Sequence, residues 1–234
     1  MPDRGLLDPN DITAVMLRGR HPAPWQIEHA RVVQVTYEVE QSAALAVMPE
    51  DVTRPVPCYA RIFILEAADG PAGPFALAAL LVGGRFRMLP RNILVRGVVG
   101  GPVDAVAGAF GSPYVSGAME IAREGASLTA TVRDGDDLVA EVTLPALRAI
   151  DPAMLRWDAW LGFAGPGDNI DLIEYGPKFE PATAFLSKGA TVESPAAQGA
   201  AGAWRALRNL NTISACYAEG PLTLSAPDVQ QALV

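Results

Sequence analysis

The residue best placed to do chemistry in this 234-residue chain is Tyr114, the last residue of a predicted Gly-Ser-Pro-Tyr turn at residues 111–114. This turn lies within a stretch, residues 92–121, that opens with a β-branched apolar run and breaks at Gly100-Gly101-Pro102. Small residues at helical spacing follow the break. A strand, a short helix and a Gly-Pro turn would hold the phenol in one place. Such a phenol can donate a hydrogen bond or a proton to a developing enolate or oxyanion.

Four arginines lie close together just before Tyr114, although the chain carries a net charge of −8: they are Arg85, Arg87, Arg91 and Arg96. Arg85 and Arg87 alternate, so a strand would present both on one face. One interpretation is a set of surface or subunit salt bridges. The other is an anchor for a carboxylate-bearing ligand, with Arg91 or Arg96 orienting the substrate.

Metal and phosphate sites find little support. His21 and His29 are the only histidines, and no cluster of cysteines or carboxylates completes a ligand set, so no metal or other cofactor is expected. The pairs Gly83-Gly84 and Gly100-Gly101 lack the spacing of a phosphate-binding loop and are read as turns.

A nucleophilic serine or cysteine is also disfavoured. Ser112 is followed by Pro113 and has no histidine near it in sequence. Cys58 and Cys216 lie in strand-like surroundings without a secretory context, so free buried thiols are favoured over a disulfide.

The composition limits the classes of partner and the cellular location that we expect for this protein. Hydrophobic residues make up 50% of the chain and charged residues only 19%. The negative net charge argues against nucleic-acid binding, which needs clustered Lys and Arg. The N-terminal residues contain no signal-peptide core, and the longest apolar run, Phe75–Val82, is too short to span a bilayer. We therefore expect a cytoplasmic protein without a membrane segment.

The elements that would position Tyr114 are mostly strands, without βαβ alternation, which predicts a single α+β or mainly antiparallel β domain over residues 1–234. Asp134-Gly135 between alternating segments is the clearest hairpin signal, and Gly83-Gly84 is read as a second hairpin. Short helices are expected at Asp8–Leu17, Gln41–Met48 and Pro227–Val234. Strands are expected at Arg31–Glu40, Pro57–Glu66, Phe75–Val82, Ile93–Val99, Ala118–Arg123, Ser127–Val132, Leu138–Leu144, Asp168–Tyr175, Asn209–Tyr217 and Leu222–Ser225.

The order of several short motifs resembles the acetoacetate decarboxylase family. That family shows a Val-x-Tyr strand, a Val-Pro-Glu-Pro turn, a Tyr-x-Glu strand and a Phe/Tyr-Pro-Lys-Lys turn. The corresponding residues here are Val35-Thr-Tyr37, Ala46-Val-Met-Pro49-Glu50, Phe75-Ala-Leu77 and Gly111-Ser-Pro113-Tyr114. The resemblance covers roughly residues 31–147. It implies a cone-like barrel of mainly antiparallel strands with short peripheral helices, and a homo-oligomer.

The differences from that family concern its catalytic positions. The family's lysine, which forms a Schiff base with a keto acid, is matched by Tyr114, and its neighbour by Val115. The family's glutamate is matched by Leu77, and an arginine of its first long strand by Ala30, or by Arg31 if the alignment shifts by one residue. A phenol cannot form an imine. Only two lysines occur, Lys178 and Lys188, and Lys178 falls in the wrong place in the order.

The sequence therefore predicts a hydrophobic pocket around Tyr114 as proton donor, lined by Phe75, Leu77, Leu94, Phe110 and Met119. The first hypothesis is an enzyme that acts without a Schiff base on a hydrophobic carbonyl, keto-acid or enol substrate, as a lyase, hydratase or C–C hydrolase. The alternative is a non-catalytic protein that binds an apolar carbonyl ligand in the same pocket.

Overall fold

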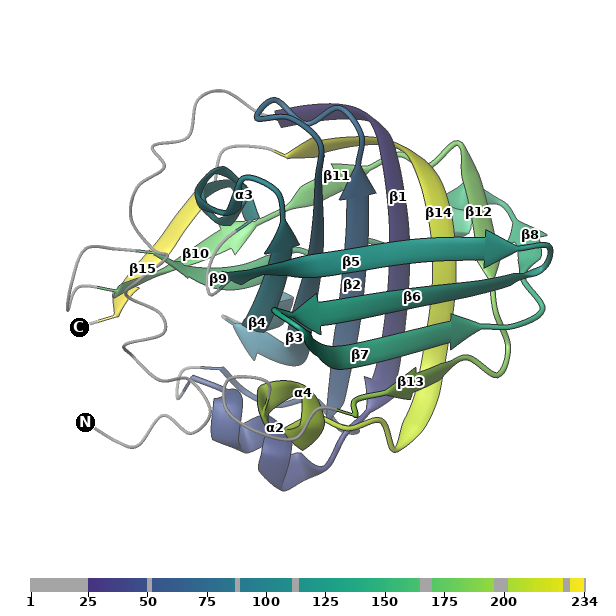
Figure 1. Ribbon diagram of the computed structural model, residues 1–234. Coiled ribbons are helices and arrows are strands. Elements are labelled where there is room, and N and C mark those ends of the chain that lie inside the picture. Colours follow the sequence, from purple (N-terminus) through teal and green to yellow (C-terminus); the bar gives the residue numbers. More distant parts are fainter. Residues whose placement is uncertain are drawn as a thin grey trace.

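The protein is built mainly from β-strands, with a few short helices at the periphery (Figure 1). The computed structural model describes residues 25–49, 52–86, 89–110, 114–164, 170–195, 202–224 and 228–233, and only the backbone of 107–110, 163–164, 170–173 and 228–233. The predicted helix Asp8–Leu17 lies outside these residues. The helical elements are α2 (Gln41–Val47), α3 (Val103–Phe110), α4 (Gly202–Ala206) and the 3₁₀ turn η1 (Pro152–Met154).

The strands follow the β-branched and aromatic runs of the sequence, which fit a pleated, half-buried surface. The long ones are β1 (Trp25–Glu38), β2 (Tyr59–Ala67), β3 (Phe75–Phe86), β4 (Leu89–Gly100), β5 (Tyr114–Glu124), β6 (Ser127–Asp134), β7 (Asp137–Leu144) and β14 (Asn211–Leu224). The short ones are β8 (Arg148–Ile150), β9 (Trp160–Ala164), β10 (Ile170–Tyr175), β11 (Pro177–Phe179), β12 (Thr183–Leu186), β13 (Thr191–Glu193) and β15 (Asp228–Leu233).

These strands form one sheet in the order β13-β7-β6-β5-β4-β3-β2-β1-β14-β12-β8, with β9, β10, β11 and β15 attached beside it. Pairing is antiparallel except where β4 meets β5 and β9. The predicted mainly antiparallel architecture is confirmed. The predicted barrel is wrong in one respect, because the strand order of the described residues is open and ends at β13 and β8 instead of closing.

The two faces of β1–β4 and β14 pack against different partners, which gives the protein two apolar layers. One face packs against β5, β6 and β7, which cross in front of the long strands (Figure 1). We call this the β5–β7 layer; it contains Val33, Val35 and Tyr37 of β1. The other face packs beneath β9, β10 and β11, and we call it the Tyr114 layer. Ala30 and Val32 of β1 belong to it, as expected from the period of two along a strand.

The stretch around Tyr114 forms a strand, a helix and a second strand, as predicted. β4 leads through Gly101 (φ 115°) and Pro102 into α3, and β5 then returns parallel to β4. Tyr114 is the first residue of β5 rather than the last of a turn; residues 111–113 lie outside the described part of the chain. Tyr114 is therefore fixed by a sheet register, opposite Gly97.

The two late strands predicted at Asn209–Tyr217 and Leu222–Ser225 form one continuous strand, β14. Two other predicted elements are wrong. Gly83-Gly84 does not form a hairpin, because β3 continues through both residues to Phe86. The glycines are needed for space: a Cβ at Gly83 would lie 2.0 Å from Cζ of Tyr59, and one at Gly84 would lie 2.4 Å from Cγ1 of Val52. The predicted C-terminal helix is the strand β15, because residues 228–233 pair with β10. Among the described helices, none has the length and apolarity to cross a bilayer.

Candidate functional site

Tyr114 is completely buried in the Tyr114 layer, with a side-chain exposure of 0%. Its hydroxyl group has no hydrogen-bond partner among the described residues. Buried phenols normally find such a partner. An unpartnered hydroxyl in an apolar layer is therefore a donor that the described residues leave unused.

Gly97 makes room for the Tyr114 ring. The two residues are direct partners in the parallel pairing of β4 and β5. A Cβ at Gly97 would lie 2.1 Å from both Cδ1 and Cε1 of the ring, closer than any side chain could tolerate. The ring therefore lies directly on the backbone of β4, and its position depends on the missing side chain.

Burial keeps the Tyr114 phenol neutral. Loss of solvent raises its pKa well above the ordinary value of 10, and the nearby Tyr175 phenol raises it further. The group therefore stays protonated at any physiological pH. It can donate a hydrogen bond to a ligand oxygen, and that bond would be strong in surroundings of low dielectric constant.

The positions that the resemblance matched to catalytic residues meet in this layer. Ala30 and Leu77 are 1% and 0% exposed and belong to the same apolar cluster as Tyr114. Arg31, the other match considered for the family's arginine, lies one residue further along β1 and so faces the opposite side of the sheet. The alignment without a shift, which matches Ala30 to the family's arginine, is thus the one compatible with a common site.

The predicted lining residues divide between the two layers. Phe75, Leu77 and Leu94 pack in the Tyr114 layer, so the structure brings these three together with Tyr114. Met119 is partly buried and packs against the β5–β7 layer. The side chain of Phe110, the last residue of α3, lies outside the described part of the chain.

Both predicted arginines are held by carboxylates. Arg91 binds Glu174 through two nitrogens, with Nε at 2.9 Å from Oε2 and an Nη at 2.8 Å from Oε1. Arg96 is buried and lies 3.2 Å from Oδ2 of Asp134, at the end of β6. The sheet register pairs Arg96 with Leu80, a member of the β5–β7 layer, so Arg96 lies on the face away from Tyr114.

Sequence reasoning missed a second polar group on the face of Tyr114. Asn92 of β4 is 0% exposed, and neither atom of its side-chain amide has a partner among the described residues. It alternates with Leu94 and therefore shares its face. Its place in the run Asn-Ile-Leu-Val was the available signal, because an amide is unusual in a buried strand. Five positions separate Asn92 from Gly97, which is about 16 Å along the strand.

Neither lysine lies in the Tyr114 layer. Lys178 is 72% exposed and forms an ion pair of 2.7 Å with Glu180, and Lys188 is exposed. The two cysteines are free and buried, as predicted. No group of three or more His, Cys, Asp or Glu side chains with the arrangement of a metal site occurs among the described residues.

A cavity of about 860 Å³ opens where β1–β4 and β14 approach their ends, and residues from both faces of the sheet border it. Its size is that of a small-molecule site. Its floor is formed by residues facing the β5–β7 side, including Arg31, Glu66 and Glu219. Ala30, Ala67 and Phe75 belong to the Tyr114 layer and also border the cavity.

Comparisons with known proteins identify the fold. No model of a known protein family matches the sequence, and no curated protein matches it. Solved structures do match. An acetoacetate decarboxylase from Legionella pneumophila has a TM-score of 0.79 and 16% identity, covering 98% of this chain and 96% of its own. Another acetoacetate decarboxylase has a TM-score of 0.78 and 15% identity, covering 97% and 100%.

An enzyme of enduracididine biosynthesis, MppR in complex with pyruvate, is similar over 89% of this chain and 91% of its own, with a TM-score of 0.73 and 16% identity. At these identities the likeness concerns the backbone and not the chemistry. The chain therefore has the acetoacetate decarboxylase fold, with a buried tyrosine, a leucine and an alanine at three positions that the sequence resemblance matched to catalytic residues.

Proposed function

We propose that this protein is a small-molecule enzyme that acts on a neutral, hydrophobic carbonyl or enol compound without forming a Schiff base. The observation that carries the proposal is the buried, unpartnered hydroxyl of Tyr114. It lies at the position that the resemblance matches to the imine-forming lysine. The similar fold of MppR, which was solved with pyruvate, supports a small carbonyl compound as the class of ligand.

The role that suits Tyr114 is hydrogen-bond donation to the carbonyl oxygen as negative charge develops on it. A donor fixed in advance in an apolar layer stabilises such a charge more strongly than water would. Its raised pKa makes complete proton transfer to a weak base unfavourable but leaves the donor intact. Lyase, hydratase and C–C hydrolase reactions all pass through an enolate or oxyanion of this kind.

A neutral substrate fits the layer better than a keto acid. A carboxylate buried among apolar side chains needs a cationic partner. Arg91 and Arg96 have carboxylate partners in Glu174 and Asp134, and Arg96 lies on the other face of β4. The proposal therefore gives Tyr114 the polar contact and leaves the apolar side chains, among them Leu77 and Leu94, to bind the rest of the substrate.

Binding without turnover is the second candidate. It is favoured by Leu77 and Ala30, whose apolar side chains stand where the resemblance places a glutamate and an arginine and can neither donate nor accept a proton. In that case the same pocket would hold an apolar carbonyl ligand and release it unchanged.

The test uses neutral and acidic carbonyl probes side by side. The neutral probes are 2,4-pentanedione and 2-heptanone, and the acidic one is pyruvate. We expect thermal stabilisation by a neutral probe, loss of that effect in Tyr114→Phe, and retention in Tyr37→Phe, whose tyrosine lies in the other layer. Product analysis then separates an enzyme from a binding protein.

Borohydride reduction with pyruvate is the decisive control. A covalent adduct would show that a lysine still forms an imine, and it would remove the proposal. Unchanged binding and turnover in Tyr114→Phe would remove the assigned role of the phenol.

A further inference from the structure

The cavity at the strand ends is organised by one row of residues that crosses six strands. Direct cross-strand partners are Gly100 with Ala76, Ala76 with Glu66, and Glu66 with Arg31. Arg31 is in turn opposite Glu219, and Glu219 opposite Thr183. Direct partners in a sheet share a face. The row therefore forms a continuous floor, with all six residues bordering the cavity.

Small side chains create the space. Gly100 and Ala76 occupy the β4 and β3 end of the row, where larger residues would fill the volume. The next positions toward the strand ends that border the cavity include Ala67, Ala68 and Gly101. The floor is therefore recessed over β3 and β4, and its charged groups lie over β2, β1 and β14.

Two of the three charged groups in the row are already engaged. Arg31 donates to Glu66, and the other carboxylate oxygen of Glu66 accepts the backbone N–H of Ile121 at 2.8 Å. Glu219 accepts a hydrogen bond from Tyr217 at one oxygen. Within the described part of the chain, its second oxygen has no hydrogen bond. One carboxylate oxygen on the floor is therefore available to a donor from a ligand.

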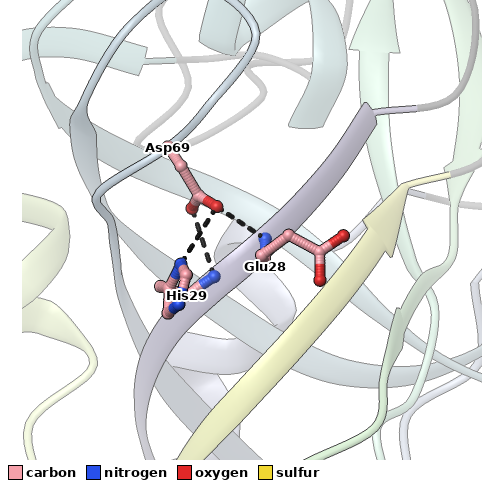
Figure 2. Close-up of polar contacts among 3 residues, drawn as sticks. All are labelled: Glu28, His29 and Asp69. Atoms are coloured by element: carbon pink, nitrogen blue, oxygen red, sulfur yellow. Dashed lines mark hydrogen bonds and ion pairs between the residues drawn. The ribbon is translucent and has the colours of Figure 1, made fainter.

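A β-bulge places further groups on the rim. The register of β1 against β14 shifts between Ile27 and Ala30, so Glu28 and His29 form the bulge. Figure 2 shows how it is fixed: Asp69 accepts the backbone N–H groups of Glu28 at 2.9 Å and His29 at 3.2 Å, and approaches the His29 ring at 3.3 Å. Bulges are often found beside binding sites because they redirect side chains. Glu28 borders the cavity without an ionic partner among the described residues.

The charge balance of this cavity favours a cation. Glu28, Glu66 and Glu219 border it against Arg31 and the exposed His29. Arg123 is nearby, but its guanidinium lies over the rings of Phe185 and Tyr217, at 4.4 and 5.7 Å from their centres. With Arg31 bound to Glu66, the unneutralised groups are the carboxylates of Glu28 and Glu219.

We infer that this cavity is a binding site for a small organic amine, with its ammonium group held by Glu219 and Glu28 and its carbon chain over the recess at Ala76 and Gly100. Ala30, Ala67 and Phe75 of the Tyr114 layer border the cavity, but the charged row faces away from Tyr114 and the inference uses no contact with its hydroxyl, so it stands or falls independently of the proposed carbonyl chemistry. A carbon chain of several atoms fits the volume, and the carboxylates of Glu28 and Glu219 supply the charge complementarity.

The experiment compares three five-carbon probes that differ only in their end groups: cadaverine, 1,5-pentanediol and glutarate. Isothermal titration of the full-length protein at low salt should show saturable binding of cadaverine, weakened by added salt. Neither the diol nor glutarate should bind comparably. Stronger binding of glutarate, equal binding of the diol, or no binding of cadaverine would each overturn the inference.

Variants localise the site. Glu219→Gln and Glu28→Gln should each weaken cadaverine binding about tenfold, the loss expected for a charged hydrogen bond. Ala76→Leu should abolish it by filling the recess, without a change in charge. Glu193→Gln, on the distant β13, is the matched control and should bind as the natural protein does. Unaltered binding in all three cavity variants would show that cadaverine binds elsewhere and refute the assignment.

Discussion

Replacing Tyr114 by Phe should make the protein more stable. The natural hydroxyl is buried and has no partner in the part of the chain that the structure describes, and an unsatisfied buried polar group costs about 1–3 kcal/mol. Phe keeps the ring on Gly97 and removes only the oxygen. Some packing around the hydroxyl is lost, so we expect the free energy of unfolding to rise by about 1 kcal/mol. For a chain of this length the melting temperature should rise by about 2–4 °C.

Tyr217→Phe is the matched comparison, because it removes the same atom from another buried tyrosine. The Tyr217 hydroxyl donates to Glu219, so this substitution breaks a hydrogen bond to a carboxylate. We expect it to lower the free energy of unfolding by about 1 kcal/mol. The two substitutions should therefore have opposite signs although their chemistry is identical.

Urea unfolding at pH 7, where both phenols are neutral, measures the two effects. The midpoints should move in opposite directions with an unchanged m value, since the surface exposed on unfolding is the same. Loss of stability in Tyr114→Phe would refute the reasoning, because it would mean that the hydroxyl has a partner in solution. The donor would then not be reserved for a ligand.

Three further predictions follow from burial and space. Gly97→Ala should lower the free energy of unfolding by about 2–3 kcal/mol, because its Cβ would collide with the Tyr114 ring. Gly176→Ala, which has open space around it, should leave the melting temperature unchanged. Burial raises the pKa of all five tyrosines, so the free energy of unfolding should be unaffected by their titration below about pH 10 and should fall above it. Absorbance near 295 nm should therefore show phenolate only when the protein unfolds. Phenolate in the folded protein at pH 10 would contradict this prediction. Burial raises the pKa of the Cys216 thiol to about 12, although Arg61 acts to lower it, so a disulfide reagent at pH 8 should label Cys216 only after denaturation.

Local patterns in the sequence predicted the strands well where pairing partners are close along the chain. The β5–β6–β7 meander and the strand–helix–strand around Tyr114 followed from alternation and turn glycines such as Gly125 and Gly135. The C-terminal segment did not, because pairing of residues 228–233 with β10 outweighs their local preference. Gly83-Gly84 was misread for a similar reason: the ring that explains Gly83 comes from another strand.

The candidate site was predictable only in part. Ala30, Leu77 and Tyr114 belong to one apolar cluster, and their role as a site stays a prediction. Arg96 would share the face of Leu94 if β4 alternated without interruption. The register shift between Leu80 and Leu81 inserts an extra residue at Val95, which sends Arg96 to the opposite face. The row beneath the cavity was out of reach, because its six residues come from six strands and share no sequence motif.

The pairing of β1 with β14 has a consequence for the folding of this protein during its synthesis. Trp25 lies opposite Leu224, so the two partners are separated by 199 positions in the sequence, and the second is synthesised long after the first. At about 5–20 residues per second, a ribosome needs roughly 10–40 s to supply the second strand after the first. Until then β1 can be covered on its β2 side only, and its other edge remains open to foreign strands. Sheet completion therefore has to wait until β14 has been made, and crowded nascent chains are the state in which aggregation of this protein should begin.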